Sequence, residues 1–93
     1  MHVVVSRTAA RYVKTRGKPI YLWQTPVGRS LAAVHVAFDP PPGRLFVPER
    51  AYGVDVHVEE GLHETSETIY VGRRIVPPWG LIARTKSGSY AVP

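Results

Sequence analysis

The sequence predicts an α+β domain, mostly β, in which one N-terminal helix is followed by short mixed and antiparallel strands. The only helical pattern covers Arg7–Arg16, and the rest of the chain alternates apolar and polar residues in short runs separated by Pro and Gly. The chain has 93 residues, enough for one hydrophobic core, so residues 1–93 are expected to form a single domain. Short strands of this kind are expected to fold as a barrel or a sandwich.

The predicted helix has clear signals at both ends. Ser6 is suited to cap its first turn, and Gly17, followed by Pro19, ends it. Its apolar residues recur at helical spacing, so one side is expected to be buried and the other exposed. The apolar side consists of Ala9, Ala10 and Val13, and the opposite side carries Arg7, Arg11 and Lys14.

Strands are predicted before and after the helix. The clearest is Val54–Glu59, in which Val54, Val56 and Val58 are expected to face the core and Asp55, His57 and Glu59 to face water. Thr25–Gly28 and Gly61–Ser66 are interpreted as turns, and the last two strands as a hairpin around Ser87-Gly88. The predicted strands are Val3–Val5, Ile20–Gln24, Leu31–Phe38, Leu45–Val47 (stopped by Pro48), Val54–Glu59, Thr68–Val71, Leu81–Arg84 and Tyr90–Val92.

The chain has no cysteine, which excludes disulfides, thiol nucleophiles and thiolate ligands for zinc or iron–sulfur clusters. It also lacks a Gly-x-Ser-x-Gly elbow and a phosphate-binding loop, so no catalytic residue is predicted and the protein is not expected to be an enzyme. Three histidines, His35, His57 and His63, with nearby carboxylates leave a metal-binding protein as an alternative, although no short metal-binding signature is present. No metal or cofactor ligand is therefore assigned.

The chain is basic, with a net charge of +5 and a pI of about 10. Such a charge favours acidic partners, among them nucleic acid, and small soluble domains often carry a similar charge. Basic and aromatic residues alternate around Tyr70, Arg73, Arg74 and Trp79, an arrangement that can hold phosphates and stack bases. A basic nucleic-acid-binding β module is therefore a second alternative.

In order along the chain, several segments resemble the HesB-like family, which includes the A-type iron–sulfur carriers. The resemblance covers nearly the whole sequence and implies a HesB-like barrel or sandwich. It rests on the strand and helix of Val5–Val13, the strand Ile20–Gln24 with the loop Thr25–Ser30, the strand end Val36–Asp39, the strand Tyr52–Val58, the strand Thr68–Val71 and the last two strands.

The carriers of this family hold their cluster with cysteines, which this chain lacks. The loop that carries the first of them corresponds to Thr25–Ser30, and the C-terminal Ser87–Pro93 offers no replacement for the other two. The resemblance therefore implies the scaffold without the cluster, and no cofactor is expected.

The favoured interpretation is a small, non-enzymatic, cytoplasmic protein on a HesB-like scaffold that acts through protein–protein contacts. The sequence lacks a run of about 20 apolar residues, so no membrane span is expected. A short disulfide-free chain is expected to gain stability as a homo-oligomer, with Pro77–Leu81 near the contact. The residues expected to contact a partner or an anion are Arg29, Arg73, Arg74 and Trp79.

Overall fold

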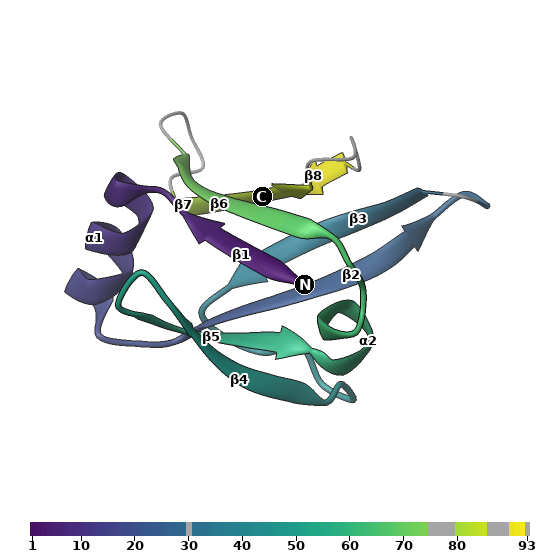
Figure 1. Ribbon diagram of the computed structural model, residues 1–93, viewed down its shortest axis with the longest axis horizontal. Coiled ribbons are helices and arrows are strands. Elements are labelled where there is room, and N and C mark those ends of the chain that lie inside the picture. The colour runs from purple at the N-terminus through teal and green to yellow at the C-terminus, as the bar shows by residue number, and fades with distance from the viewer. Residues whose placement is uncertain (30, 75–79, 86–89, 93) are drawn as a thin grey trace.

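Two mixed β-sheets face each other, and helix α1 lies across one end of them (Figure 1). The computed structural model describes residues 1–29, 31–74, 80–85 and 90–92. The α+β, mostly β class is confirmed, and the two sheets do not close into a barrel over the described ranges. The elements are β1 (His2–Val5), α1 (Arg7–Arg16), β2 (Ile20–Val27), β3 (Leu31–Ala37), β4 (Phe46–Ala51), β5 (Val54–Glu59), α2 (Glu60–His63), β6 (Thr68–Arg74), β7 (Gly80–Thr85) and β8 (Tyr90–Val92).

The smaller sheet has the order β1-β6-β7, and the larger has the order β4-β5-β2-β3-β8. Parallel pairs join β1 to β6, β5 to β2 and β3 to β8, and the other neighbours are antiparallel. The strand order places β5 beside β2 only as far as Leu22, where β5 has reached Val58. Beyond that point β5 turns into α2, so the second half of β2 loses its neighbour on this side.

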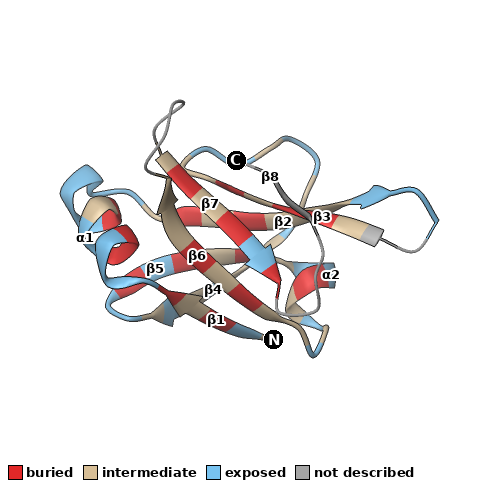
Figure 2. Cartoon of the chain, turned by 90° about the horizontal axis from the view of Figure 1, so that it is seen from above, coloured by how far each residue is buried: buried red, intermediate tan, exposed pale blue. Residues whose placement is uncertain are grey.

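The hydrophobic core lies between the sheets, where buried residues alternate with more exposed ones along the strands (Figure 2). Val54, Val56 and Val58 are all buried, as the alternation predicts, and Val56 is 0% exposed. Burying one such valine contributes about 1.5–3 kcal/mol. From the other strands and helices the core receives Val3, Val5, Ala9, Ala10, Val13, Ile20, Leu22, Val34, Val36, Leu62, Ile69, Val71, Leu81 and Ala83.

Helix α1 begins and ends at the residues that the sequence predicts. The Ser6 side chain accepts a hydrogen bond from the Ala9 N–H at 3.1 Å, and Gly17 takes a left-handed conformation with φ +67°. From there the Gly17 N–H donates to the carbonyls of Val13 and Lys14. These local caps explain why the helix boundaries can be predicted without knowledge of the sheet.

Two predicted strand ends are wrong because a proline was read as a stop. Pro26 lies inside β2, and Pro48 lies inside β4. A proline is tolerated in a strand when no neighbouring strand lies on the side to which its N–H would point. β4 is an edge strand, and Pro26 follows the point at which β5 leaves β2. The predicted turn at Thr25–Gly28 therefore starts three residues too early, because β2 continues to Val27.

Two further predictions need correction. Gly61–Ser66 is not simply a turn, because the short helix α2 covers Glu60–His63 and buries Leu62. The last two strands do not pair as a hairpin: β7 pairs with β6, and β8 runs parallel to β3 in the other sheet. The predicted turn Ser87-Gly88 and residues 77–79 of the predicted contact segment Pro77–Leu81 lie outside the described residues. Neither described helix has the length and apolar composition of a membrane span.

Candidate functional site

The exposed side of α1 carries a row of cations. Arg7, Arg11 and Lys14 are all exposed, opposite the buried Ala9, Ala10 and Val13. Their spacing of four and three residues places them on one side of the helix. None of the three forms an ion pair with any residue that the structure describes. The basic side predicted from the sequence is therefore present and available for contact.

Two cations of this row, Arg7 and Arg11, do not stabilise the helix that carries them, whereas Lys14 lies in the last turn, where a positive charge is favourable. The first turn of α1 contains no acidic residue, and Arg7 places a positive charge at the positive end of the helix dipole. Arg7 and Arg11 are also like charges at i and i+4, which costs about 0.2–0.5 kcal/mol. Residues that break a local rule without an internal partner are expected at functional sites.

Tyr52 stands beside this row, in the turn between β4 and β5. The pairing of Ala51 with Val54 leaves a two-residue turn, Tyr52-Gly53, in which both residues have positive φ (+55° and +75°). This is the geometry of a type I′ turn, whose first position favours Asn, Asp or Gly. A tyrosine there is strained, by about 1–2 kcal/mol for an L-residue, and its side chain is not buried in compensation: Tyr52 is 56% exposed.

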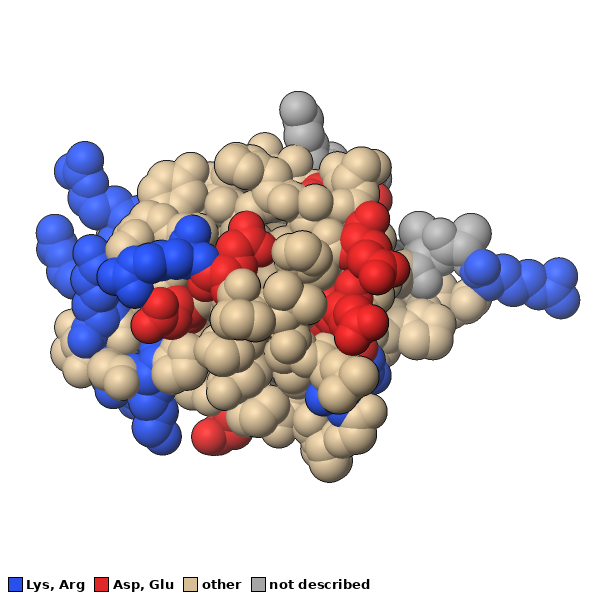
Figure 3. Space-filling view, turned by 60° about the horizontal axis from the view of Figure 1, so that its bottom comes forward, with Lys and Arg blue, Asp and Glu red and all other residues tan. Residues whose placement is uncertain are grey.

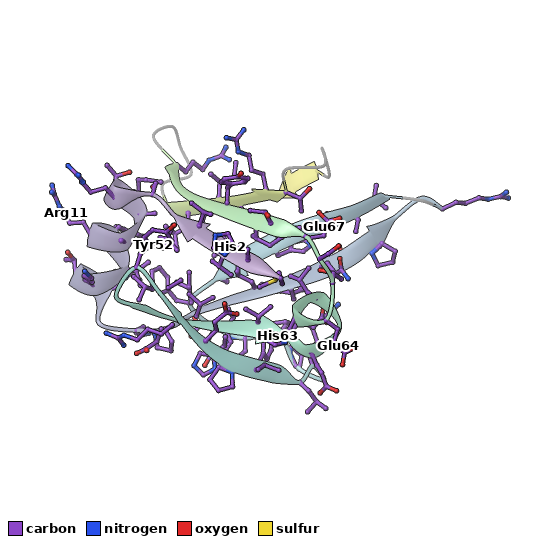
Figure 4. All side chains as sticks on the ribbon, in the orientation of Figure 1. His2, Arg11, Tyr52, His63, Glu64 and Glu67 are labelled. Carbon is purple, nitrogen blue, oxygen red and sulfur yellow. The ribbon has the colours of Figure 1, made fainter. Side chains whose placement is uncertain are left out.

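An open groove of about 780 Å³ separates the basic side of α1 from Tyr52. Val5 and Ala10, both buried, lie at its base, and the exposed side chains of Arg7, Arg11, Lys14, Thr15 and Tyr52 supply most of its surface. We call this the α1 groove. Gly53 helps to shape it, because a Cβ at that position would come within 3.1 Å of the Lys14 Nζ. Figure 4 shows Arg11 and Tyr52 at the same end of the molecule.

The charged residues are segregated over the surface. In Figure 3, most Lys and Arg side chains gather at the end where α1 lies, Asp and Glu lie mainly over the middle of this face and beyond it, and a further basic side chain extends from the opposite end. Glu60 of α2 and Glu64, which follows this helix, are among the exposed acidic residues. A polyanion is therefore attracted most strongly to the end of the molecule where α1 lies.

A second polar cluster lies at the other end, where β5 leaves β2. The Glu59 Oε1 accepts from the Gln24 N–H at 3.2 Å, and the Arg44 Nη1 donates to the Gln24 carbonyl at 3.2 Å. Arg44 and Glu59 also form an ion pair. Together these two side chains satisfy the backbone groups of β2 that a neighbouring strand would otherwise bond. The expectation that Glu59 faces water is wrong, because its side chain is only 16% exposed.

His35 adjoins this cluster. Its Nε2 lies 2.8 Å from the Thr25 hydroxyl, and its ring stacks on Trp23 with centroids 5.2 Å apart. Burial, followed by the positive charge of Arg44, lowers the pKa of His35 below its ordinary 6.5. The imidazole is therefore mainly neutral near pH 7, and its Nε2 shares a hydrogen bond with the Thr25 hydroxyl. We assign this arrangement a structural role, since the Arg44–Glu59 pair beside it is used to satisfy the backbone.

The three histidines do not converge on a metal site. His57 packs at 4.8 Å against the ring of Tyr21, His35 is held by Thr25, and the His63 Nε2 lies 3.9 Å from Glu49. Over residues 1–29, 31–74, 80–85 and 90–92, no group of three or more metal-capable side chains comes together.

The predicted contact residues are dispersed. Arg29 is exposed between β2 and β3, whereas Arg73 lies over the ring of Tyr12, with its guanidinium carbon 3.6 Å from the centroid. Arg74 has an interaction partner and lines a groove with Tyr12, and Trp79 lies outside the described residues. Of the described ones, Arg29, Arg73 and Arg74, none lines the α1 groove. Whether Arg29, Arg73, Arg74 and Trp79 contact a partner stays a prediction.

Tyr52 is the site residue that sequence reasoning missed. Tyr52-Gly53 resembles a turn only once the register of β4 against β5 is known, and the predicted stop at Pro48 removed that register. A Tyr-Gly pair before an alternating strand was the available signal.

No family model matches the chain, and a search of curated proteins found no match to it.

Proposed function

We propose that the protein binds nucleic acid, with the phosphate backbone held in the α1 groove. The observation that carries this proposal is a row of three unpaired cations beside an exposed, strained tyrosine. Cations that make the helix less stable are explained if an external anion pairs with them. This develops the nucleic-acid alternative from the sequence and moves its location from the β6–β7 region to α1.

The spacing of the cations supports a polyanion over a single small anion. With a rise of about 1.5 Å per residue, Arg7, Arg11 and Lys14 are separated along the helix by about 6 and 4.5 Å. Phosphates of one nucleic-acid strand recur at a similar distance, about 3.4 Å in a stacked duplex and more when the strand is extended. Successive side chains of α1 can therefore contact successive phosphates.

Tyr52 favours nucleic acid over an acidic protein as the partner of the α1 groove. An exposed aromatic ring next to phosphate-binding cations is the arrangement that stacks a base, a contact that contributes about 1–3 kcal/mol. An acidic peptide would use the cations and leave the ring without a matching group. The overall charge of +5 supports the same class of partner.

The test is fluorescence anisotropy with a labelled 12-nucleotide oligo(dT) at several salt concentrations. We expect a dissociation constant of about 10⁻⁴–10⁻⁶ M at physiological salt. The triple variant R7Q/R11Q/K14Q should bind at least tenfold more weakly and show a flatter salt dependence, by about 0.7 in logarithmic slope for each cation removed. R29Q removes one exposed arginine outside the groove and is the control.

Two results would contradict the proposal. One is equal loss of affinity in the Arg29→Gln control and in a single α1 variant, which would show binding by net charge alone. The other is that polyglutamate competes as well as oligo(dT) at equal charge, which would favour an acidic protein partner. The proposal of a protein-contacting HesB-like scaffold would then be preferred, and sedimentation at micromolar concentration would test its homo-oligomer.

A further inference from the structure

The α1 groove continues into two neighbouring hollows at the C-terminal end of α1. It shares Lys14 with a smaller depression of about 220 Å³ at the C-terminal end of the helix, which also contains Gly17, Lys18 and Gly53. That depression in turn shares Lys18 with a third groove, of about 540 Å³, on the other side of α1. The three hollows therefore follow one another around the end of the helix.

The third groove also contains cations and aromatic rings. Arg16 lies over two rings there, with its guanidinium carbon 5.1 Å from the centroid of Phe38 and 5.9 Å from that of Tyr12. Both rings are partly buried against the core, whereas Arg16 and Lys18 are exposed. The path thus begins at cations beside an exposed ring, Tyr52, and ends at exposed cations that lie beside partly buried rings.

Two carboxylates border the path. Asp55 lines the small depression, and its charge is balanced by Arg50 at 2.8 Å. Asp39 lines the third groove and is exposed, with no ion pair to any described residue. Five exposed cations of the described residues, Arg7, Arg11, Lys14, Arg16 and Lys18, outnumber the one unbalanced carboxylate.

We infer that the ligand is a single strand that bends around the C-terminal end of α1 from the α1 groove into the groove of Arg16 and Phe38. This rests on the proposed function. A duplex is too stiff to bend around one helix end, whereas a single strand follows such a path easily. With α1 about 15 Å long and the path continuing past it, the strand in contact is on the order of five to eight nucleotides.

The experiment compares oligo(dT) of 4, 8 and 12 nucleotides with a 12-base-pair duplex, in the native protein and in K18Q, R16Q and R11Q. The native affinity should rise at least tenfold from 4 to 8 nucleotides and little beyond, and the duplex should bind more weakly than the 12-mer. K18Q and R16Q should leave the 4-mer affinity within twofold and reduce the 8-mer affinity about fivefold. D39N should increase the 8-mer affinity. R11Q should weaken every length.

The outcomes separate the two proposals. If R11Q weakens binding but K18Q and R16Q leave the 8-mer unaffected, the strand does not pass the end of α1 and this inference is wrong, while the proposed function stands. Tighter binding of the duplex than of the 12-mer also overturns it. If R11Q has no effect on any length, the proposed function itself fails. Circular dichroism melts of each variant exclude a loss of folding, since all four positions are exposed.

Discussion

The cations of α1 and the cation Arg44 are used in opposite ways. Arg44 is partly buried, paired with Glu59, and bonded to the backbone of β2 where β5 has left it. Arg7, Arg11 and Lys14 are exposed, and none is paired with a described residue. The first arrangement completes the fold, whereas in the second Arg7 and Arg11 weaken the helix slightly and three charges stay available. The difference teaches that the basic residues most informative about function are exposed ones that no described residue pairs with.

The α1 cations and the Arg44–Glu59 cluster are both expected to depend on one hydrophobic core, and Val56→Asp tests this. Val56 is 0% exposed, and an unpaired carboxylate there should cost more than about 4 kcal/mol, enough to unfold a small domain. We expect loss of the cooperative melt in circular dichroism together with loss of oligonucleotide binding. A folded variant that still binds would mean that the α1 end is stable by itself.

Glu59→Leu separates stability from binding. It leaves the Gln24 N–H without its acceptor and Arg44 without its ion-pair partner, so the free energy of unfolding should fall by about 2 kcal/mol. Oligonucleotide affinity of the folded variant should stay within twofold. The control is Asp55→Asn, which removes an exposed ion pair and should cost less than about 1 kcal/mol in urea denaturation. Equal losses in the two variants would contradict the structural role of Glu59.

Tyr52→Asn should change stability and binding in opposite directions. Asn adopts positive φ readily, so the turn is relaxed and stability should rise by about 0.5–1 kcal/mol. Loss of the ring should weaken oligonucleotide binding about fivefold. Tyr52→Phe keeps the ring and should bind like the native protein. A variant that is more stable and binds equally well would remove Tyr52 from the site.

His35 gives the smallest effect, and it belongs to the Arg44 side of the comparison. Because its folded pKa is lowered, the unfolded chain takes up a proton first as the pH falls below 6.5. The stability that the neutral imidazole contributes is therefore complete above 6.5 and is lost as the pH falls toward the folded pKa. The slope from this one group is at most about 1.4 kcal/mol per pH unit.

This pH dependence is measured as the difference between the native protein and His35→Gln in urea denaturation between pH 7.5 and 5. The native protein should lose more stability than the variant over that range. Parallel curves would mean that His35 titrates normally in the fold. Oligonucleotide binding, corrected for the folded fraction, should not distinguish the two proteins.

Local signals determined what could be predicted from the sequence. α1 was predicted at its observed bounds because Ser6 and Gly17 act within one turn, and the β5 alternation suffices to bury Val56. No local sequence pattern shows which strand will lie beside another. The extent of β2, the strand around Pro48 and the position of β8 all depend on that neighbouring strand. The same holds for the site: the basic side of α1 was predictable, whereas its juxtaposition with Tyr52 required the register of β4 on β5.

The two strand prolines bear on how copies of this chain can meet. The N–H and the carbonyl of Gln24 point to the side of β2 on which Glu59 and Arg44 lie. Pro26, two residues later, faces the same side of the strand but has no N–H to donate. Pro48 interrupts β4, the outermost strand of the larger sheet. Fibril growth by edge-to-edge strand addition is thus impeded at both places. Copies of this chain that meet at these two edges are therefore expected to do so through side-chain contacts rather than through a continuous backbone ladder.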